Sequence, residues 1–118
     1  MALTASWVNI YISDNATFQD AFQFTIPNGY QIGTNTWEMG VKASRDDVAN
    51  LALFTSAAGQ ITIADPVNNI INMNVPDTTI QSELPCGTYD YDLIMTQGSV
   101  RTQMMQGKLI VKHGVSET

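Results

Sequence analysis

The chain has 118 residues, of which 44% are hydrophobic and 14% are charged, and its formal net charge is −6. This length and hydrophobic content predict one folded domain over residues 1–118 with a single buried core, and they exclude a disordered chain. The five Lys and Arg residues are scattered singly. We therefore expect binding neither to nucleic acid nor to an anionic membrane surface, because both require clustered cations.

The chain contains a single cysteine, Cys86, so an intrachain disulfide is excluded. Cys86 stands between Pro85 and Gly87, and no His or cation adjoins it in the sequence. We expect a small buried apolar residue there instead of a reactive thiol. No apolar run approaches the roughly 18 residues of a membrane span. The first residues lack a basic region followed by an apolar run, so we expect synthesis in the cytoplasm.

An alternation of apolar and polar residues predicts a first strand over residues 7–12. In this strand Val8, Ile10 and Ile12 are expected to face the core. Trp7 and Tyr11 then face outward, because successive side chains of a strand point to opposite faces.

The second predicted strand spans residues 17–26 and carries large apolar side chains on one face: Phe18, Phe22, Phe24 and Ile26. Asp20 interrupts this face, so we expect a bulge or a strand end at that position. Pro27-Asn28-Gly29 predicts a turn directly after the strand.

Four short apolar runs follow, over residues 37–43, 51–54, 61–63 and 71–75, separated by turn sequences such as Asp65-Pro66. Residues 77–84 differ and predict the only helix. Asp77 or Thr78 would cap its start, and Ile80 and Leu84 would form an apolar pair four residues apart.

The final third predicts two strands, over residues 88–95 and 100–111, with Gly98 in the hairpin between them. Tyr89, Tyr91, Leu93 and Met95 share the core face of the first of these strands. Gly107 is expected to mark a bulge in the second strand. In total the pattern predicts about seven or eight short strands and an all-β antiparallel sandwich or small barrel.

The predicted core collects the inward-facing apolar residues of these strands. It comprises Val8, Ile10, Phe22, Phe24, Trp37, Met39, Val41, Ile63, Ile71, Met73, Tyr89, Tyr91, Leu93, Leu109 and Val111.

No catalytic pattern emerges, so we expect no enzyme activity and no cofactor. His113 lies near the chain end, where a catalytic imidazole would be poorly positioned. A structural zinc site needs about four Cys or His ligands and the chain has two such residues, so we expect no metal site. Asp90 and Asp92 are expected to lie on a solvated strand face that discourages edge pairing. Asp46-Asp47 lacks the spaced oxygen ligands of a calcium loop, whereas a loose calcium site shared between loops stays open.

Four residues are candidates for an interface: Trp7, Tyr11, Met104 and Met105. Exposed aromatic residues and methionines are enriched at protein–protein interfaces. Partial cover of these side chains by a loop fits the sequence equally well.

The order of segments in residues 36–112 resembles that of small immunoglobulin-like β-sandwich modules of tailed bacteriophages. The resemblance rests on Trp37-Glu38-Met39, Ile61-Thr62-Ile63, and residues 71–76, 79–85, 87–93 and 107–111. The Phe-rich run over residues 18–24 departs from the family pattern, which usually begins with a more polar strand pair. The resemblance implies an immunoglobulin-like sandwich, a structural role in the virion and no active site.

Three functions follow as expectations. The first is a capsid decoration or cement subunit, self-associating and bound to phage capsid proteins in the virion. The second is a subunit of the tail, baseplate or fibre attachment. The third is a carbohydrate- or receptor-binding module that uses Trp7, Trp37 or the Tyr residues as stacking platforms.

Overall fold

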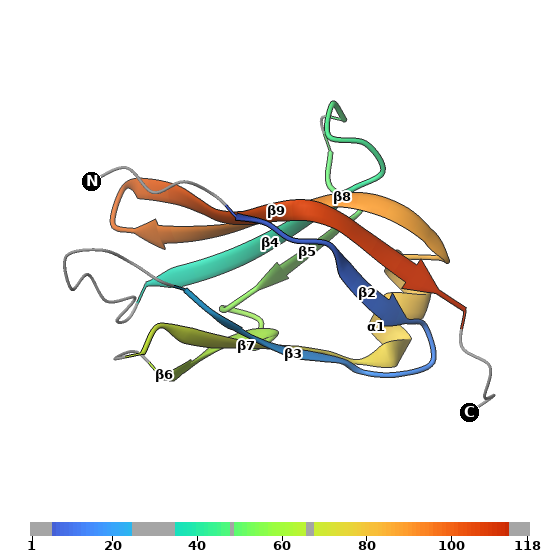
Figure 1. The fold of residues 1–118 in the computed structure, drawn as a ribbon, viewed down its shortest axis with the longest axis horizontal. Helices are drawn as coiled ribbons and strands as arrows, with labels where there is room; N and C mark the ends of the chain where they lie inside the picture. The colour runs from blue at the N-terminus through green and yellow to red at the C-terminus, as the bar shows by residue number, and fades with distance from the viewer. Residues whose placement is uncertain (1–5, 25–34, 48, 66–67, 114–118) are drawn as a thin grey trace.

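The computed structural model describes residues 6–24, 35–47, 49–65 and 68–113, which form two β-sheets and one short helix (Figure 1). The prediction of an all-β chain with one helix is therefore confirmed. The predicted turn at Pro27-Asn28-Gly29, the inward-facing Ile26 and the turn residue Pro66 lie outside the described residues.

The larger sheet has six strands, in the order β1-β9-β8-β4-β5, with β2 also paired to β9. Their bounds are β1 Ser6–Trp7, β2 Ile10–Ser13, β4 Thr36–Lys42, β5 Ala52–Thr55, β8 Gly87–Gln97 and β9 Val100–Lys112. Both β1 and β2 run parallel to β9. The expectation of a purely antiparallel sheet is therefore wrong at this edge. Local alternation cannot report strand direction, because pairing between distant segments decides it.

The smaller sheet consists of β3 (Phe18–Gln23), β7 (Ile70–Val75) and β6 (Ile61–Asp65), with β7 in the middle and all pairs antiparallel. Asp20 lies directly opposite Met73 in an unbroken register. The predicted bulge or strand end at Asp20 is therefore wrong. Asp20 is exposed, so its carboxylate interrupts the apolar pattern without breaking the ladder.

Helix α1 (Asp77–Glu83) connects β7 of the smaller sheet to β8 of the larger one (Figure 1). Ile80 and Leu84 are fully buried, which confirms the predicted apolar pair. The N-cap residue is Pro76 and no side chain caps the helix, so capping by Asp77 or Thr78 is wrong. Asp77 lies inside the first turn instead, where its negative charge interacts favourably with the positive N-terminal end of the helix dipole.

The core fills the space between the two sheets and includes most of the predicted residues. Buried as predicted are Ile10, Trp37, Met39, Val41, Ile71, Met73, Tyr89, Tyr91, Leu93, Leu109 and Val111. Phe22, Phe24 and Ile63 are only partly buried and pack against this cluster. Val8 is the one predicted core residue on the surface, with 38% of its area exposed.

Val8 is exposed because the predicted first strand is broken where the chain passes Gly107. Gly107 has a φ of +155°, and a Cβ built on it would lie 2.1 Å from the carbonyl oxygen of Val8. The Tyr91 hydroxyl donates to the same oxygen at 2.6 Å. Gly107 therefore marks a close backbone approach and not the predicted bulge.

The bulge in β9 lies at Met104 instead. Leu93 pairs with Met105 and Ile94 pairs with Gln103, so Met104 is the extra residue. A bulge allows two consecutive side chains to point to the same side. Met104 and Met105 are consequently both buried, with 5% and 3% of their areas exposed. The prediction that they form part of an interface is wrong for the folded chain.

Candidate functional site

The two aromatic interface candidates lie together at one edge of the larger sheet, which we call the aromatic edge (Trp7 and Tyr11). Trp7 ends β1 and is 57% exposed, and Tyr11 lies in β2 and is 64% exposed. Their predicted outward orientation is therefore confirmed. They pair with Gln106 and Ile110 of β9, which places both on the outer face of the sheet.

A cation accompanies each ring of the aromatic edge. The guanidinium of Arg45 lies 5.5 Å from the centroid of the Trp7 ring, and Lys112 Nζ lies 5.6 Å from that of Tyr11. Such contacts contribute about 0.5–1 kcal/mol at exposed sites. Arg45 also donates to Gln106 Oε1 at 3.1 Å, which holds its loop against the sheet. The rings are thereby oriented, so less conformational freedom would be lost when a partner covers them.

The backbone at the aromatic edge is also available to a partner. Within the described part of the chain, β1 and β2 pair only with β9, so their other side has no strand beside it. An unpaired strand edge can accept an extended segment of another protein.

A second exposed apolar pair lies at the opposite edge of the larger sheet. Leu51 and Leu53 are 49% and 45% exposed. Ala52 and Phe54, which alternate with them along the chain, are buried. The sequence run over residues 51–54 is continuously apolar and gives no sign of this alternation. The structure separates the two faces because successive side chains point to opposite sides of the sheet, and only Ala52 and Phe54 point into the core.

Asp90 and Asp92 lie on the outer face of the larger sheet but not at an edge, since β8 is flanked by β9 and β4. Their predicted role against edge pairing is therefore wrong. Asp90 accepts from Lys108 Nζ at 2.6 Å and from the backbone N–H of Arg45 at 2.7 Å. The bond from Lys108 holds the pKa of Asp90 below its usual range. Burial instead raises the pKa of Asp92.

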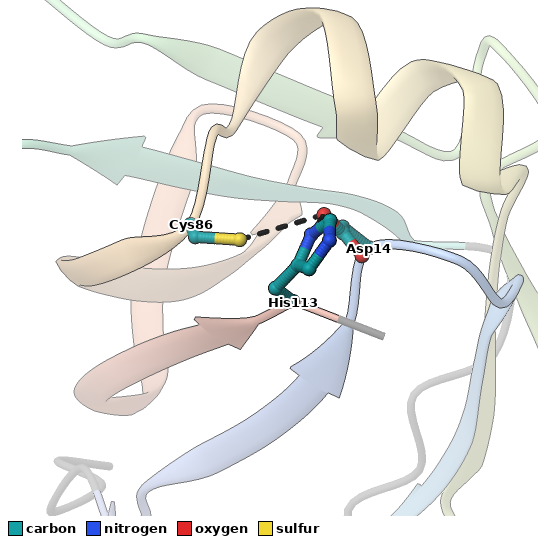
Figure 2. A group of neighbouring side chains, drawn as sticks. All are labelled: Asp14, Cys86 and His113. Atoms are coloured by element: carbon teal, nitrogen blue, oxygen red, sulfur yellow. Dashed lines mark hydrogen bonds and ion pairs between the residues drawn. The ribbon is translucent and has the colours of Figure 1, made fainter. Parts of the chain in front are cut away.

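Asp14, Cys86 and His113 form a side-chain cluster at the end of the larger sheet near α1 (Figure 2). The Asp14 Oδ2 atom lies 3.4 Å from Cys86 Sγ and 2.9 Å from His113 Nδ1. Cys86 is exposed, so the prediction that it is buried is wrong. His113 was predicted to be poorly positioned because it lies near the chain end, but its imidazole contacts the Asp14 carboxylate here.

The cluster does not have the geometry of an activated cysteine. In a Cys–His nucleophile the imidazole takes the thiol proton, whereas here the carboxylate lies between sulfur and imidazole. Loss of solvation, with the Asp14 carboxylate beside it, raises the pKa of Cys86. A raised pKa leaves the thiol protonated and weakly nucleophilic.

The number of Cys and His residues does not reveal this cluster, because one of its three ligand groups is a carboxylate. Asp14 is remote from both other residues in sequence, so no local motif could have revealed it. Among the described residues, this is the one group of three or more His, Cys, Asp or Glu side chains with converging ligand atoms. Asp46 and Asp47 do not belong to such a group, and Asp47 Oδ2 accepts from the Ser44 N–H at 3.1 Å.

Trp37, considered above as a stacking platform, is unavailable for that role. It is 2% exposed and stacks on Phe24, with ring centroids 5.4 Å apart. An open depression of about 410 Å³ lies on the smaller sheet, and its lining contains no aromatic ring: Gln19, Asp20, Gly59, Thr62, Asn72, Met73 and Asn74. Tyr89 and Tyr91 are also buried, so among these candidates the described residues offer exposed rings only at the aromatic edge, and Tyr30 lies outside the described residues.

In the described parts of the chain, no helix is both long and apolar enough to cross a bilayer. A scan against protein-family models finds no match, and a search of curated proteins finds none either.

Proposed function

We propose that this chain is an immunoglobulin-like module. The strand order supports this assignment: β9, β8, β4 and β5 follow one another in one sheet, and β3, β7 and β6 form the other. Variable-type immunoglobulin domains arrange their strands G, F, C and C′ in one sheet and B, E and D in the other. Taken in sequence order, β3, β4, β5, β6, β7, β8 and β9 correspond to strands B, C, C′, D, E, F and G.

Two side chains support the same assignment. Trp37 lies in β4, the strand that corresponds to C, and is buried in the core as the immunoglobulin tryptophan is. Tyr89 lies near the start of β8, the strand that corresponds to F, and its hydroxyl donates to the carbonyl oxygen of Pro85. A bond from this position back to the preceding corner is the tyrosine corner of these domains.

The module works as a structural subunit of a phage particle, most specifically as a capsid decoration or cement protein. The observation that carries this proposal is the aromatic edge, where two exposed rings lie beside a strand edge that no other described strand pairs with. Such a surface fits contact with another protein. The phage assignment rests on the segment order over residues 36–112. Copies that self-associate can contact several identical sites at once, so modest single contacts combine into strong binding without a deep pocket.

The proposal is tested by adding purified protein to particles that lack it and counting bound copies per major capsid subunit. We expect saturable binding at a fixed ratio and greater heat resistance of the particle, by mass action. Binding of a few copies at one vertex would assign the module to the tail, baseplate or fibre attachment. Absence of binding to any particle part would refute the structural role.

Variants locate the contact surface. Trp7→Ala and Tyr11→Ala remove exposed rings, so they should weaken particle binding while leaving the melting temperature nearly unchanged. Leu53→Ala is the matched control, since it removes an exposed apolar side chain from the opposite edge. Stronger loss with Leu53→Ala than with Trp7→Ala would move the contact to β5. Self-association, which we also propose, is read from the mass of the free protein in solution.

Glycan binding is the second candidate, because exposed aromatic rings also stack on sugars. It is favoured only by Trp7 and Tyr11, since Trp37 is buried. Glycan binding by the free protein that is lost in Tyr11→Ala would favour this function over particle assembly.

A further inference from the structure

We propose that Asp14, Cys86 and His113 form a binding site for a single zinc ion, with water as the fourth ligand. The three side chains offer a carboxylate oxygen, a cysteine sulfur and an imidazole nitrogen, and these atoms all lie within 4.8 Å of one another. This inference is independent of the proposed role in a phage particle.

The fold brings the three residues together through strand register. Ser13 of β2 pairs with Lys112 of β9 in a parallel ladder, so the next residues, Asp14 and His113, emerge side by side. Gly87 of β8 pairs with Val111 of β9, which places Cys86 at the same end of the sheet. The site therefore joins the ends of three adjacent strands.

Asp14 is held in place at the centre of the cluster. Its backbone N–H donates to the Lys112 carbonyl oxygen at 2.9 Å, and its own carbonyl accepts from Gln81 Nε2 of α1 at 2.8 Å. Its side chain is only 16% exposed, whereas that of His113 is 83% exposed. A fixed carboxylate next to an exposed imidazole allows His113 to adjust when an ion enters.

The two distances from Asp14 Oδ2 are close to those of tetrahedral zinc. With Zn–S near 2.3 Å and Zn–N and Zn–O near 2.0–2.2 Å, ligand atoms lie roughly 3.3–3.7 Å apart. Sγ of Cys86 is already 3.4 Å from Asp14 Oδ2. The 2.9 Å contact between His113 Nδ1 and Oδ2 must lengthen by about half an ångström. When Zn²⁺ binds, the Cys86 thiol releases its proton to solvent, and His113 Nδ1 binds the ion while the ring proton lies on Nε2.

The ligand types select the metal. Calcium and magnesium prefer sites built from oxygen atoms, whereas sulfur and imidazole ligands suit zinc and its substitute cobalt. Figure 2 shows Cys86 and His113 both directed toward Asp14. Cys86 and His113 are exposed, so solvent can supply the water ligand, as in zinc sites with three protein ligands.

The test is calorimetric titration of the full metal-free chain with Zn²⁺ under reducing conditions, alongside Co²⁺ absorption spectroscopy. We expect one Zn²⁺ per chain, a thiolate-to-cobalt charge-transfer band, and no competition by Ca²⁺. Zn²⁺ should also raise the melting temperature, since it binds only the folded arrangement.

Variants assign the ligands. Cys86→Ser, His113→Gln and Asp14→Asn should each weaken Zn²⁺ binding by more than the ~10–100-fold typical of losing an outer-shell partner. Glu83→Gln is the matched control, because it neutralises an exposed carboxylate at the same end of the molecule, outside the cluster. Circular dichroism of the metal-free variants checks that each one folds. Unchanged Zn²⁺ affinity in Cys86→Ser, or a cobalt complex without the charge-transfer band, would overturn the proposal.

Discussion

Replacement of Gly107 by Ala tests the close approach that breaks the first strand. The new Cβ would lie 2.1 Å from the Val8 carbonyl oxygen and 2.8 Å from its carbonyl carbon. The two backbones must separate by more than about 1 Å to reach van der Waals contact. Gly107 pairs with Tyr91 on β8, so β9 cannot simply retreat without disturbing this ladder.

The expected loss follows from the contacts that such a separation breaks. The Val8 N–H donates to Gln106 at 2.8 Å, and the Tyr91 hydroxyl donates to Val8 at 2.6 Å. Each bond contributes about 0.5–1.5 kcal/mol. A side chain at a φ of +155° adds about 1–3 kcal/mol of backbone strain. Gly107→Ala should therefore lower the free energy of unfolding by roughly 2–6 kcal/mol.

Urea denaturation, followed by circular dichroism, measures this loss. Gly59→Ala is the matched control: Gly59 has a φ of +80°, but nothing lies within 4 Å of its added Cβ. It should cost only the strain of the left-handed region, about 1–2 kcal/mol. Tyr91→Phe removes the hydroxyl alone, so its effect should be smaller in the Gly107→Ala background than in the wild type. Equal losses for Gly107→Ala and Gly59→Ala would refute the steric argument.

Three further predictions concern β8. Leu93→Ala empties a fully buried site and should lower the free energy of unfolding, measured by urea denaturation, by about 2–5 kcal/mol. Thr88 is exposed on the same strand, so Thr88→Ala should change this free energy by no more than about ±0.5 kcal/mol. Similar losses for the two variants would show that the assignment of core and solvent faces to this strand is wrong. Tyr89→Phe removes the hydroxyl bond to Pro85 and should cost about 0.5–1.5 kcal/mol in the same assay, and no loss would argue against a tyrosine corner. Asp92→Asn should stabilise the protein at pH 7, because burial raises the pKa of Asp92 above its ordinary value of 3.8 and ionised Asp92 therefore opposes folding. The wild type regains this stability as the pH falls through the raised pKa, because Asp92 becomes neutral. Its melting temperature should therefore match that of the variant below pH 3.8. A difference in melting temperature that stays constant at all pH values would contradict this.

The sequence by itself determined which segments form strands or a helix, and which of their faces are buried, wherever the pattern involves only neighbouring residues. The alternation of Tyr89, Tyr91 and Leu93 assigned one face of β8 to the core, because a strand turns successive side chains to opposite sides. The pair Ile80 and Leu84 identified the buried face of α1, since residues four apart share one side of a helix. These features depend only on a few neighbouring residues.

Tertiary structure decided everything that depends on pairing between distant segments. The bulge at Met104 directs both Met104 and Met105 into the core, although the sequence predicted them at the surface. The close approach of Val8 to Gly107 leaves Val8 on the surface, although the sequence predicted it in the core. The parallel register of β2 with β9 placed Asp14 beside His113, 99 positions apart in sequence. Register and strand direction are set by the summed pairing and packing of whole strands, which no local pattern of residues contains.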